Sequence, residues 1–278
     1  MQLSQHSLSD FVDCPRRYYL HYVARQAWPL LESGPGGLDP LEYRAYLRRG
    51  VVLHRMIERH MLGIGAGKPP EPNQEPELAV WYSRFLATDL STLPAQRVPE
   101  LALVAPLADA GLYVRYDLLA FDDERTVPDT SARRFVIIDW KTIRGNRPPS
   151  TSWFVRRLQT RAYLYSLVAG GAPYNNGVPI APDQCSMRYW LANFPGQPWV
   201  EIGYSVAGYA ADARMLQSLA ADIAARATQS DFPLTTDERN CTYCTYRTLC
   251  NLVGAPDADL VIDDEPTAED SEVPELEY

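Results

Sequence analysis

Three closely spaced cysteines near the carboxyl end of the sequence could hold a metal centre. Cys241, Cys244 and Cys250 stand in the stretch CTYCTYRTLC, with the spacing C-x2-C-x5-C. A four-ligand site needs one more thiolate, and the remaining cysteines are Cys14 and Cys185. Such spacing fits tetrahedral zinc as well as an iron-sulfur cluster. A fourth ligand at Cys14 would join the two ends of the chain.

The stretch IIDWKT places a carboxylate and an ammonium group side by side. Asp139 and Lys141 are two residues apart in an apolar run that predicts a strand, and alternate residues of a strand share a face. The chain uses arginine for nearly all its basic residues, and its only lysines are Lys68 and Lys141. A lysine at this position favours a role for a compact charge or a proton donor. D-x-K alone is a common pattern, but the pair suits a metal site beside a polarised water.

Two further residues could complete such a site. Asp117 interrupts the apolar stretch YVRYDLLAF, where a carboxylate must be paired or metal-bound. An ion pair with Arg115 is the simpler explanation, and a divalent cation shared with Asp139 is the one that we favour. Oxygen ligands indicate Mg or Mn. His54 lies on a predicted helix, where a lone histidine is more often a packed core residue than a ligand.

The helix predicted at 152–168 carries a polar and basic face. Gln159 and Tyr163 are four residues apart and so lie on the same side. Three arginines accompany them: Arg156, Arg157 and Arg161. A solvated face is the ordinary explanation. We favour a helix that contacts phosphate groups beside the metal site.

The elements that must position these residues form a mixed pattern. A capping box of Ser7 with Asp10 predicts the first helix. Helices are expected at 7–14, 42–62, 78–90, 152–168 and 209–228, and strands at 100–106, 111–121, 133–142, 185–194 and 198–206. Polar turns separate the strands, and 65–76 is expected to be a loop. This order predicts an α/β domain.

Composition limits the class of protein. The 278 residues are 46% hydrophobic, which is typical of a folded globular chain. No apolar run approaches the roughly 18 residues of a membrane span, and the start MQLSQHSLSD carries no export signal. We therefore expect a cytoplasmic protein with no membrane partner. The net charge of -9 comes from residues 256–278, which hold ten acidic residues and no basic one. We expect this tail to be disordered, and the nearly neutral remainder could bind nucleic acid.

The order of these motifs resembles the PD-(D/E)XK nuclease superfamily. The closer resemblance is to its RecB-like branch with a four-cysteine iron-sulfur cluster, which includes AddB-type nuclease domains and CRISPR-associated exonucleases. The branch's N-terminal motif is similar to Ser7, Leu8 (shifted by one), Phe11, Cys14, Pro15, Arg16 and Tyr18; its G-x-x-x-H motif to Gly50 and His54; its second acidic motif to Asp117; its D-x-K motif to Asp139 and Lys141; and its Q-x-x-x-Y motif to Gln159 and Tyr163. The family usually has glycine where this chain has Val114.

The resemblance implies an α/β fold with a restriction-endonuclease-like mixed β-sheet core flanked by helices. It also implies an iron-sulfur subdomain built from both ends of the chain, with Cys14, Cys241, Cys244 and Cys250 holding a [4Fe-4S] cluster. Cys185 is then expected to be a buried thiol. The expected segments are an N-terminal helical region at 1–99, the nuclease core at 100–230, the cluster segment at 231–255 and the acidic tail at 256–278.

The activity implied by the resemblance is metal-dependent hydrolysis of DNA. One or two Mg or Mn ions would be held by His54, Asp117, Asp139 and the main-chain carbonyl of Trp140. Lys141 would polarise the attacking water, and Gln159 and Tyr163 would position the substrate strand. The arginines expected to contact DNA are Arg16, Arg17, Arg156, Arg157 and Arg161.

These roles describe an exonuclease or end-processing nuclease that acts on single-stranded DNA. It would serve DNA repair and recombination or CRISPR spacer acquisition, beside a helicase or CRISPR adaptation proteins. The alternative is a non-catalytic iron-sulfur DNA-binding subunit of a larger helicase-nuclease or adaptation complex.

Overall fold

The computed structural model describes residues 1–26, 40–64, 75–143, 145, 147–241 and 244–250. Most of the loop expected at 65–76 and all of the acidic tail at 256–278 lie outside the described residues. Within the described ranges, no helix combines the length and the apolar character that crossing a membrane requires.

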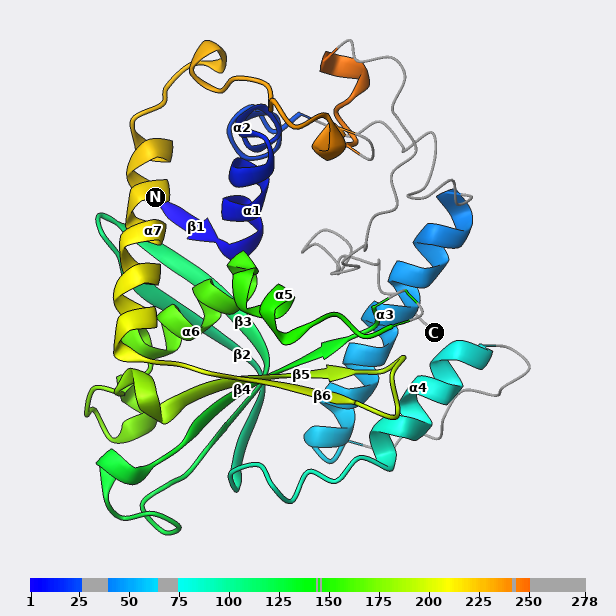
Figure 1. Ribbon diagram of the computed structural model, residues 1–278, viewed down its shortest axis with the longest axis vertical. Helices are drawn as coiled ribbons and strands as arrows, with labels where there is room; N and C mark the ends of the chain where they lie inside the picture. The colour runs from blue at the N-terminus through cyan, green and yellow to red at the C-terminus, as the bar shows by residue number, and fades with distance from the viewer. Residues whose placement is uncertain (27–39, 65–74, 144, 146, 242–243, 251–278) are drawn as a thin grey trace.

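A six-stranded mixed sheet forms the centre of the molecule (Figure 1). Its strands are β1 (Gln2–Ser4), β2 (Gln96–Leu107), β3 (Ala110–Phe121), β4 (Phe135–Lys141), β5 (Cys185–Leu191) and β6 (Trp199–Gly203). The order along the sheet is β1-β3-β4-β5-β6, and β2 pairs with β3. The β1–β3 and β4–β5 pairs are parallel and the other pairs are antiparallel. The short β1 was not expected from the sequence.

One edge of β3 is shared by two strands. β1 pairs with the start of β3 at Gly111–Tyr113, and β4 pairs with its end at Leu118–Phe121. β2 runs along the opposite edge of β3 from end to end. In the described part of the chain, no strand therefore pairs with residues 114–117 on the edge that β1 and β4 share. Asp117 thus lies at the fork where β3 and β4 separate.

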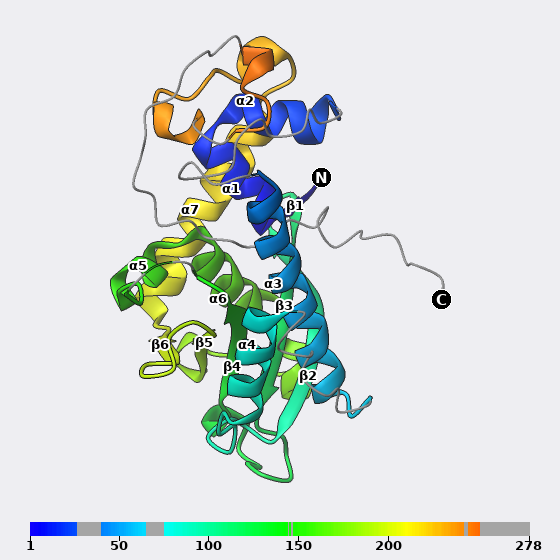
Figure 2. The ribbon, with the colours of Figure 1, turned by 90° about the vertical axis from the view of Figure 1, so that its right-hand side faces the viewer.

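Helices cover both faces of this sheet (Figure 2). They are α1 (Gln5–Asp13), α2 (Pro15–Tyr18), which continues as a π-helical turn at Tyr19–Val23, α3 (Pro40–Met61), α4 (Pro76–Leu86), α5 (Thr151–Arg156), α6 (Leu158–Gly170) and α7 (Val206–Ala224). α3 and α4 lie on one face, and α6 and α7 lie on the other.

Two hydrophobic cores result, one on each face of the sheet. Every residue of β4 is buried, and its side chains alternate between the two cores. Val136, Ile138 and Trp140 pack in the core beneath α3 and α4, whereas Phe135 and Ile137 pack in the core beneath α6 and α7. The same alternation directs residues 139 and 141 towards the face that α6 covers.

Two expectations about helices are wrong. The single helix expected at 152–168 is two helices, because Arg157 has extended backbone (φ -64°, ψ 138°). The Thr160 hydroxyl lies 2.6 Å from the Phe154 carbonyl, which a continuous helix would use for its own ladder. The first helix begins earlier than expected, because Ser4 is its N-cap and forms the capping box with Ser7.

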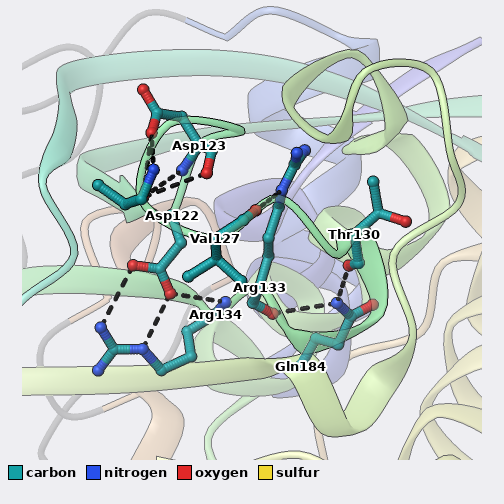
Figure 3. A network of polar contacts seen from close by, with 8 residues as sticks. Asp122, Asp123, Val127, Thr130, Arg133, Arg134 and Gln184 are labelled. Carbon is teal, nitrogen blue, oxygen red and sulfur yellow. Dashed lines mark hydrogen bonds and ion pairs between the residues drawn. The ribbon is translucent and has the colours of Figure 1, made fainter.

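Polar contacts fix the loop that leads into β4 (Figure 3). Arg134 pairs with Asp122 at 2.9 Å, and Gln184 donates hydrogen bonds to the carbonyls of Thr130 and Arg133 at 2.7 and 3.0 Å. The Arg133 side chain is itself buried and donates to the Val127 carbonyl at 2.8 Å. The starting point of β4 is therefore held firmly, and this strand carries Asp139 and Lys141 near its carboxyl end.

The two ends of the described chain pack together, at the top of the view in Figure 1. The Arg16 amide donates to the Pro233 carbonyl at 3.1 Å, and Asn240 donates to the Asp13 carbonyl at 2.8 Å. The buried ring of Phe232 packs against the rings of α1 and α2, with Tyr18 stacked on it at 5.9 Å between centroids. Direct contacts between protein groups therefore already connect the residues around position 14 with those around position 240.

Candidate functional site

Asp117 and Asp139 lie at the fork between β3 and β4, one on each strand. The last antiparallel pair in this ladder is Leu118 with Ile138, so the next pair in register would be Asp117 with Asp139. The ladder does not continue, because the amide of Trp140 donates instead to Asp117 Oδ2 at 2.7 Å. The side chain of Asp117 thus takes the place of a backbone acceptor at the point where the strands separate.

Helix α3 crosses the end of β4 at close range. A Cβ atom at Gly50 would lie 3.3 Å from the Thr142 hydroxyl, and the Tyr46 hydroxyl donates to the Thr142 carbonyl. Glycine at position 50 permits this approach because it has no side chain. His54 stands one turn further along α3 and therefore reaches the fork.

His54 contacts both strands of the fork. Its Nε2 lies 2.7 Å from the main-chain oxygen of Trp140, and its Nδ1 lies 3.5 Å from Asp117 Oδ1. The described residues contain one group of three potential metal ligands whose atoms all lie within 4.8 Å of one another, and its members are His54, Glu100 and Asp117. Carboxylate oxygens with one imidazole nitrogen fit Mg or Mn.

Glu100 is the residue of this group that sequence reasoning missed, because it looked like the first residue of an apolar strand. Pro99 pairs with Leu118 and Leu101 pairs with Tyr116, so Glu100 lies opposite Asp117. Its φ of +50° is unusual for a residue with a side chain and interrupts the ladder at this point. The tight turn between β2 and β3 fixes this register. Counting back from that turn in the sequence was the one way to predict that Glu100 lies opposite Asp117.

The groups in the fork alter one another's pKa. Burial acts to lower the pKa of His54, but the charge of Asp117, its hydrogen bond and the charge of Asp139 together outweigh burial and raise the pKa to about 9. Burial, followed by repulsion from Asp117, raises the pKa of Glu100 to about 7. Burial opposes ionisation of Asp117, but the charge and hydrogen bond of His54, the Trp140 amide and the charge of Lys141 together outweigh burial and lower the pKa of this carboxyl. At neutral pH the fork therefore holds a protonated His54 beside an ionised Asp117, a charge arrangement that a divalent cation could replace.

Asp139 is contacted at both of its oxygens. Lys141 Nζ lies 3.2 Å from Oδ2, and Gln159 Nε2 of α6 donates to Oδ1 at 2.8 Å. All three side chains are at least 95% buried. Lys141 can thus offer its charge only to a group that enters the fork.

Tyr163 fastens α6 to the unpaired edge of β3. Its hydroxyl donates to the Arg115 carbonyl at 2.8 Å, and the Tyr116 hydroxyl donates to the Tyr163 carbonyl at 3.1 Å. Gln159, one turn earlier, contacts β4, so α6 spans the fork. Gln159 and Tyr163 are both buried against the sheet, so the solvated face weighed as the ordinary explanation for this helix does not include them.

Residues 2–251 match the family model of the PD-(D/E)XK nuclease superfamily. The chain belongs to this superfamily. A solved structure described as the crystal structure of SSO0001 is 15% identical, with 90% of this chain and 85% of that chain covered and a TM-score of 0.39. No curated protein matches the chain. Membership in the superfamily indicates a metal-dependent nuclease that hydrolyses phosphodiester bonds of nucleic acid.

Two of the arginines expected to contact the nucleic-acid substrate of this superfamily lie at the junction of the chain ends. Arg16 donates through Nε to the Phe232 carbonyl at 2.8 Å. Arg17 pairs with Asp10 at 2.7 Å and with Asp13 at 2.6 Å. Both therefore take part in contacts within the protein and lie on a different part of the fold from the fork.

The other three arginines lie on α5 and α6 and differ in their surroundings. Arg161 pairs with buried Asp212 of α7 at 2.6 Å. The guanidinium of Arg157 lies over the Trp153 ring, 4.6 Å from its centroid. Arg156 is exposed at the end of α5. The ion pair suggested between Asp117 and Arg115 does not form, because Arg115 pairs with Glu100 at 3.2 Å.

Four cysteines line one pocket between the two ends of the chain. They are Cys14, Cys241, Cys244 and Cys250. Burial raises the pKa of the thiols at 241, 244 and 250, and the neighbouring Cys14 adds to the increase at each. Within the described residues, no three of these sulfurs lie within 4.8 Å of one another. Cys185 lies elsewhere, buried at the start of β5.

Proposed function

We propose that this superfamily member is a deoxyribonuclease that removes nucleotides from, or trims, the ends of single-stranded DNA. The observation that carries the proposal is the fork itself, where Asp117, Asp139, His54 and Lys141 come together from three elements. Two carboxylates beside a buried lysine are the donor set that metal-assisted phosphodiester hydrolysis requires.

His54, Glu100 and Asp117 would hold the metal ion, with Asp139 and the carbonyl of Trp140 as the further ligands. When bound, Mg or Mn lowers the pKa of a coordinated water and neutralises charge that develops on the phosphate. Four of these five donors were predicted from the sequence, and Glu100 is added on the basis of its position opposite Asp117.

The remaining residues orient the reactants. Lys141, held 3.2 Å from Asp139, would place its ammonium against the attacking water or a phosphate oxygen. Gln159 would fix Asp139, and Tyr163 would fix α6 against β3. Their part in catalysis is thus to hold the helix and the carboxylate rather than to touch the DNA strand directly.

Arg156 and Arg157 are the arginines best placed to contact substrate phosphates, since Arg156 ends α5 and Arg157 lies at the break between α5 and α6, just before Gln159. The half-buried Trp153 beneath Arg157 offers a ring on which a base could stack. Arg16, Arg17 and Arg161 would contribute positive charge while they keep their partners within the protein.

We further propose that Cys14, Cys241, Cys244 and Cys250 hold a [4Fe-4S] cluster, as in the RecB-like branch. The four thiols line one pocket, which supports a shared metal centre, and the resemblance to the RecB-like branch favours iron-sulfur over tetrahedral zinc. Burial raises the pKa of the thiols at 241, 244 and 250, and Arg16, Arg17 and Arg247 oppose that increase at individual thiols.

The role of this cluster would be to fasten the two ends of the chain, since it closes a loop of more than two hundred residues. The biological setting that we propose is DNA repair and recombination or CRISPR spacer acquisition, in company with a helicase or with adaptation proteins.

The test is digestion of end-labelled single-stranded and double-stranded DNA with Mg or Mn. We expect shortened products from single strands and no products in the presence of a chelator. Comparison of strands labelled at the 5′ end with strands labelled at the 3′ end gives the polarity of cleavage. If anaerobically purified, folded protein binds DNA without cutting it under any of these conditions, the nuclease proposal fails. A non-catalytic iron-sulfur DNA-binding subunit would then be the better description.

A further inference from the structure

The break between α5 and α6 lies directly beside the fork. Arg157 begins α6 with extended backbone and without a hydrogen bond from its side chain to the helix. The first turn of a helix leaves backbone amides without helical partners, and a capping side chain normally fixes that turn. Gln159, which contacts Asp139, stands in this first turn. Its position therefore has to be set by another contact.

Two buried hydroxyl groups supply that contact. Thr160 Oγ1 lies 2.6 Å from the Phe154 carbonyl at the end of α5, and 2.6 Å from the Tyr189 hydroxyl on β5. Thr160 is 2% exposed and Tyr189 is 0% exposed. The Tyr189 hydroxyl also lies 3.5 Å from Gln159 Oε1. The pair thus joins α5, the first turn of α6 and β5 at one point.

The protons fix the direction of this chain of contacts. Each hydroxyl carries one proton, and a carbonyl can only accept. Thr160 therefore donates its proton to the Phe154 carbonyl. In the 2.6 Å contact between the two hydroxyls, Tyr189 is then the donor and the Thr160 oxygen is the acceptor. Tyr189 is the parallel register partner of Asp139, and its ring stacks on Phe154 at 4.3 Å between centroids. The chain leads from the strand position beside Asp139 to the turn that carries Gln159.

We propose that Thr160 and Tyr189 are positioning residues that set Gln159 against Asp139 and so orient this carboxylate. Without the hydroxyl pair, the first turn of α6 can shift relative to β5, and the Gln159 amide loses its fixed distance from Asp139 Oδ1. Asp139 then loses its fixed contact with α6. The inference rests on the proposed function, in which Asp139 is a metal ligand.

The test compares Tyr189→Phe and Thr160→Val with two matched variants. Thr160→Ser keeps the hydroxyl, and Tyr165→Phe removes a buried hydroxyl on the same helix that donates to the Pro106 carbonyl at 2.8 Å, away from the fork. The readouts are Mn affinity by calorimetry, and kcat and KM on end-labelled single-stranded DNA. We expect Tyr189→Phe and Thr160→Val to lower Mn affinity and kcat about 10-fold to 100-fold, because that is the usual effect of losing a group that orients a metal ligand. KM should change little. Thr160→Ser and Tyr165→Phe should stay within about threefold of the unchanged protein, as variants that leave those contacts intact.

Equal Mn affinity and kcat in Tyr189→Phe and Tyr165→Phe, with both folded, would overturn the inference. If Tyr189→Phe does not fold, the comparison of Thr160→Val with Thr160→Ser decides it. If the unchanged protein cuts no DNA, the proposed function fails, and Mn affinity still reports separately on the positioning pair.

Discussion

His54 Nε2 and the main-chain oxygen of Trp140 lie 2.7 Å apart, although both atoms belong to the proposed set of metal ligands. A carbonyl oxygen can only accept, so Nε2 carries a proton and donates it to Trp140 O; the pKa of His54, raised to about 9, keeps the whole ring protonated at neutral pH. That proton lies between two atoms that would both bind the metal ion, one on α3 and one on β4. Metal binding must therefore displace it.

Metal affinity is expected to rise with pH. Burial opposes protonation of His54, but Asp117 raises its pKa to about 9; burial and Asp117 together raise the pKa of Glu100 to about 7. Both groups bind metal only after losing a proton, so protons compete with the ion below these values. From the His54 pKa alone, affinity should increase about tenfold per pH unit between pH 7 and pH 8 and level off above pH 9.

Calorimetric titration with Mn in buffers of different ionisation enthalpy measures this proton release. His54→Gln is the control, because it should bind more weakly and lose the dependence above pH 7. A Mn affinity that stays constant from pH 7 to pH 9 in the unchanged protein would show that His54 carries no competing proton.

Replacement of Lys141 should separate catalysis from metal binding. Lys141→Ala removes the ammonium beside Asp139 and should lower kcat about 100-fold or more, the range for loss of a group that handles charge or protons in the reaction. Mn affinity should fall far less than in Asp139→Ala. Lys141→Arg keeps the charge but not its compact shape, and should also be poorly active. Full activity of the arginine variant would mean that charge alone is needed.

Substitution of Glu100 tests both its ligand role and its backbone. Glu100→Ala and Glu100→Gly each remove the carboxylate, so both should lower Mn affinity by at least about tenfold, as loss of a ligand group does. The glycine variant should nevertheless unfold at higher denaturant concentration, because the φ of +50° costs alanine about 1 kcal/mol relative to glycine.

Chemical denaturation of the two Glu100 variants gives that difference directly, and Glu201→Ala, which removes an exposed partner of Arg188, serves as the control for Mn affinity. Unchanged Mn binding in both Glu100 variants would remove Glu100 from the ligand set.

Removal of single cysteines should identify the group held between the chain ends. Anaerobically purified protein is expected to contain about four iron and four sulfide per chain, as a [4Fe-4S] cluster does. Cys14→Ala and Cys244→Ala should lose iron and visible absorbance, whereas Cys185→Ala should retain both, since Cys185 is buried at β5 away from the pocket. One zinc per chain and no sulfide would contradict the iron-sulfur proposal.

The features that local patterns determine were predictable from the sequence. The apolar alternation around Asp139 and Lys141 predicts a strand with both side chains on one face, and β4 spans Phe135–Lys141 as a fully buried strand. Asp117 was recognised because a carboxylate in an apolar stretch needs a partner, and the structure places it at the fork with His54. The catalytic roles of these residues stay predictions.

Features that depend on contacts between distant residues were not predictable. Glu100 became visible only through the register of β2 on β3, which sets it opposite Asp117. The break at Arg157 depends on the Thr160 hydroxyl and its contact with Tyr189, which no local propensity encodes. The burial of Gln159 and Tyr163 against the sheet was not predictable either, because periodicity indicates which residues share a side of a helix but not what covers that side.

The most direct test of the account is single-turnover cleavage of end-labelled single-stranded DNA by Asp139→Asn, beside the exposed control Asp129→Asn. The substitution keeps the size of the Asp139 side chain and removes only its charge. We expect Asp139→Asn to fold and to cut at least about 100-fold more slowly, while Asp129→Asn matches the unchanged protein. Equal cleavage by the two variants would contradict the assignment of the fork as the active site.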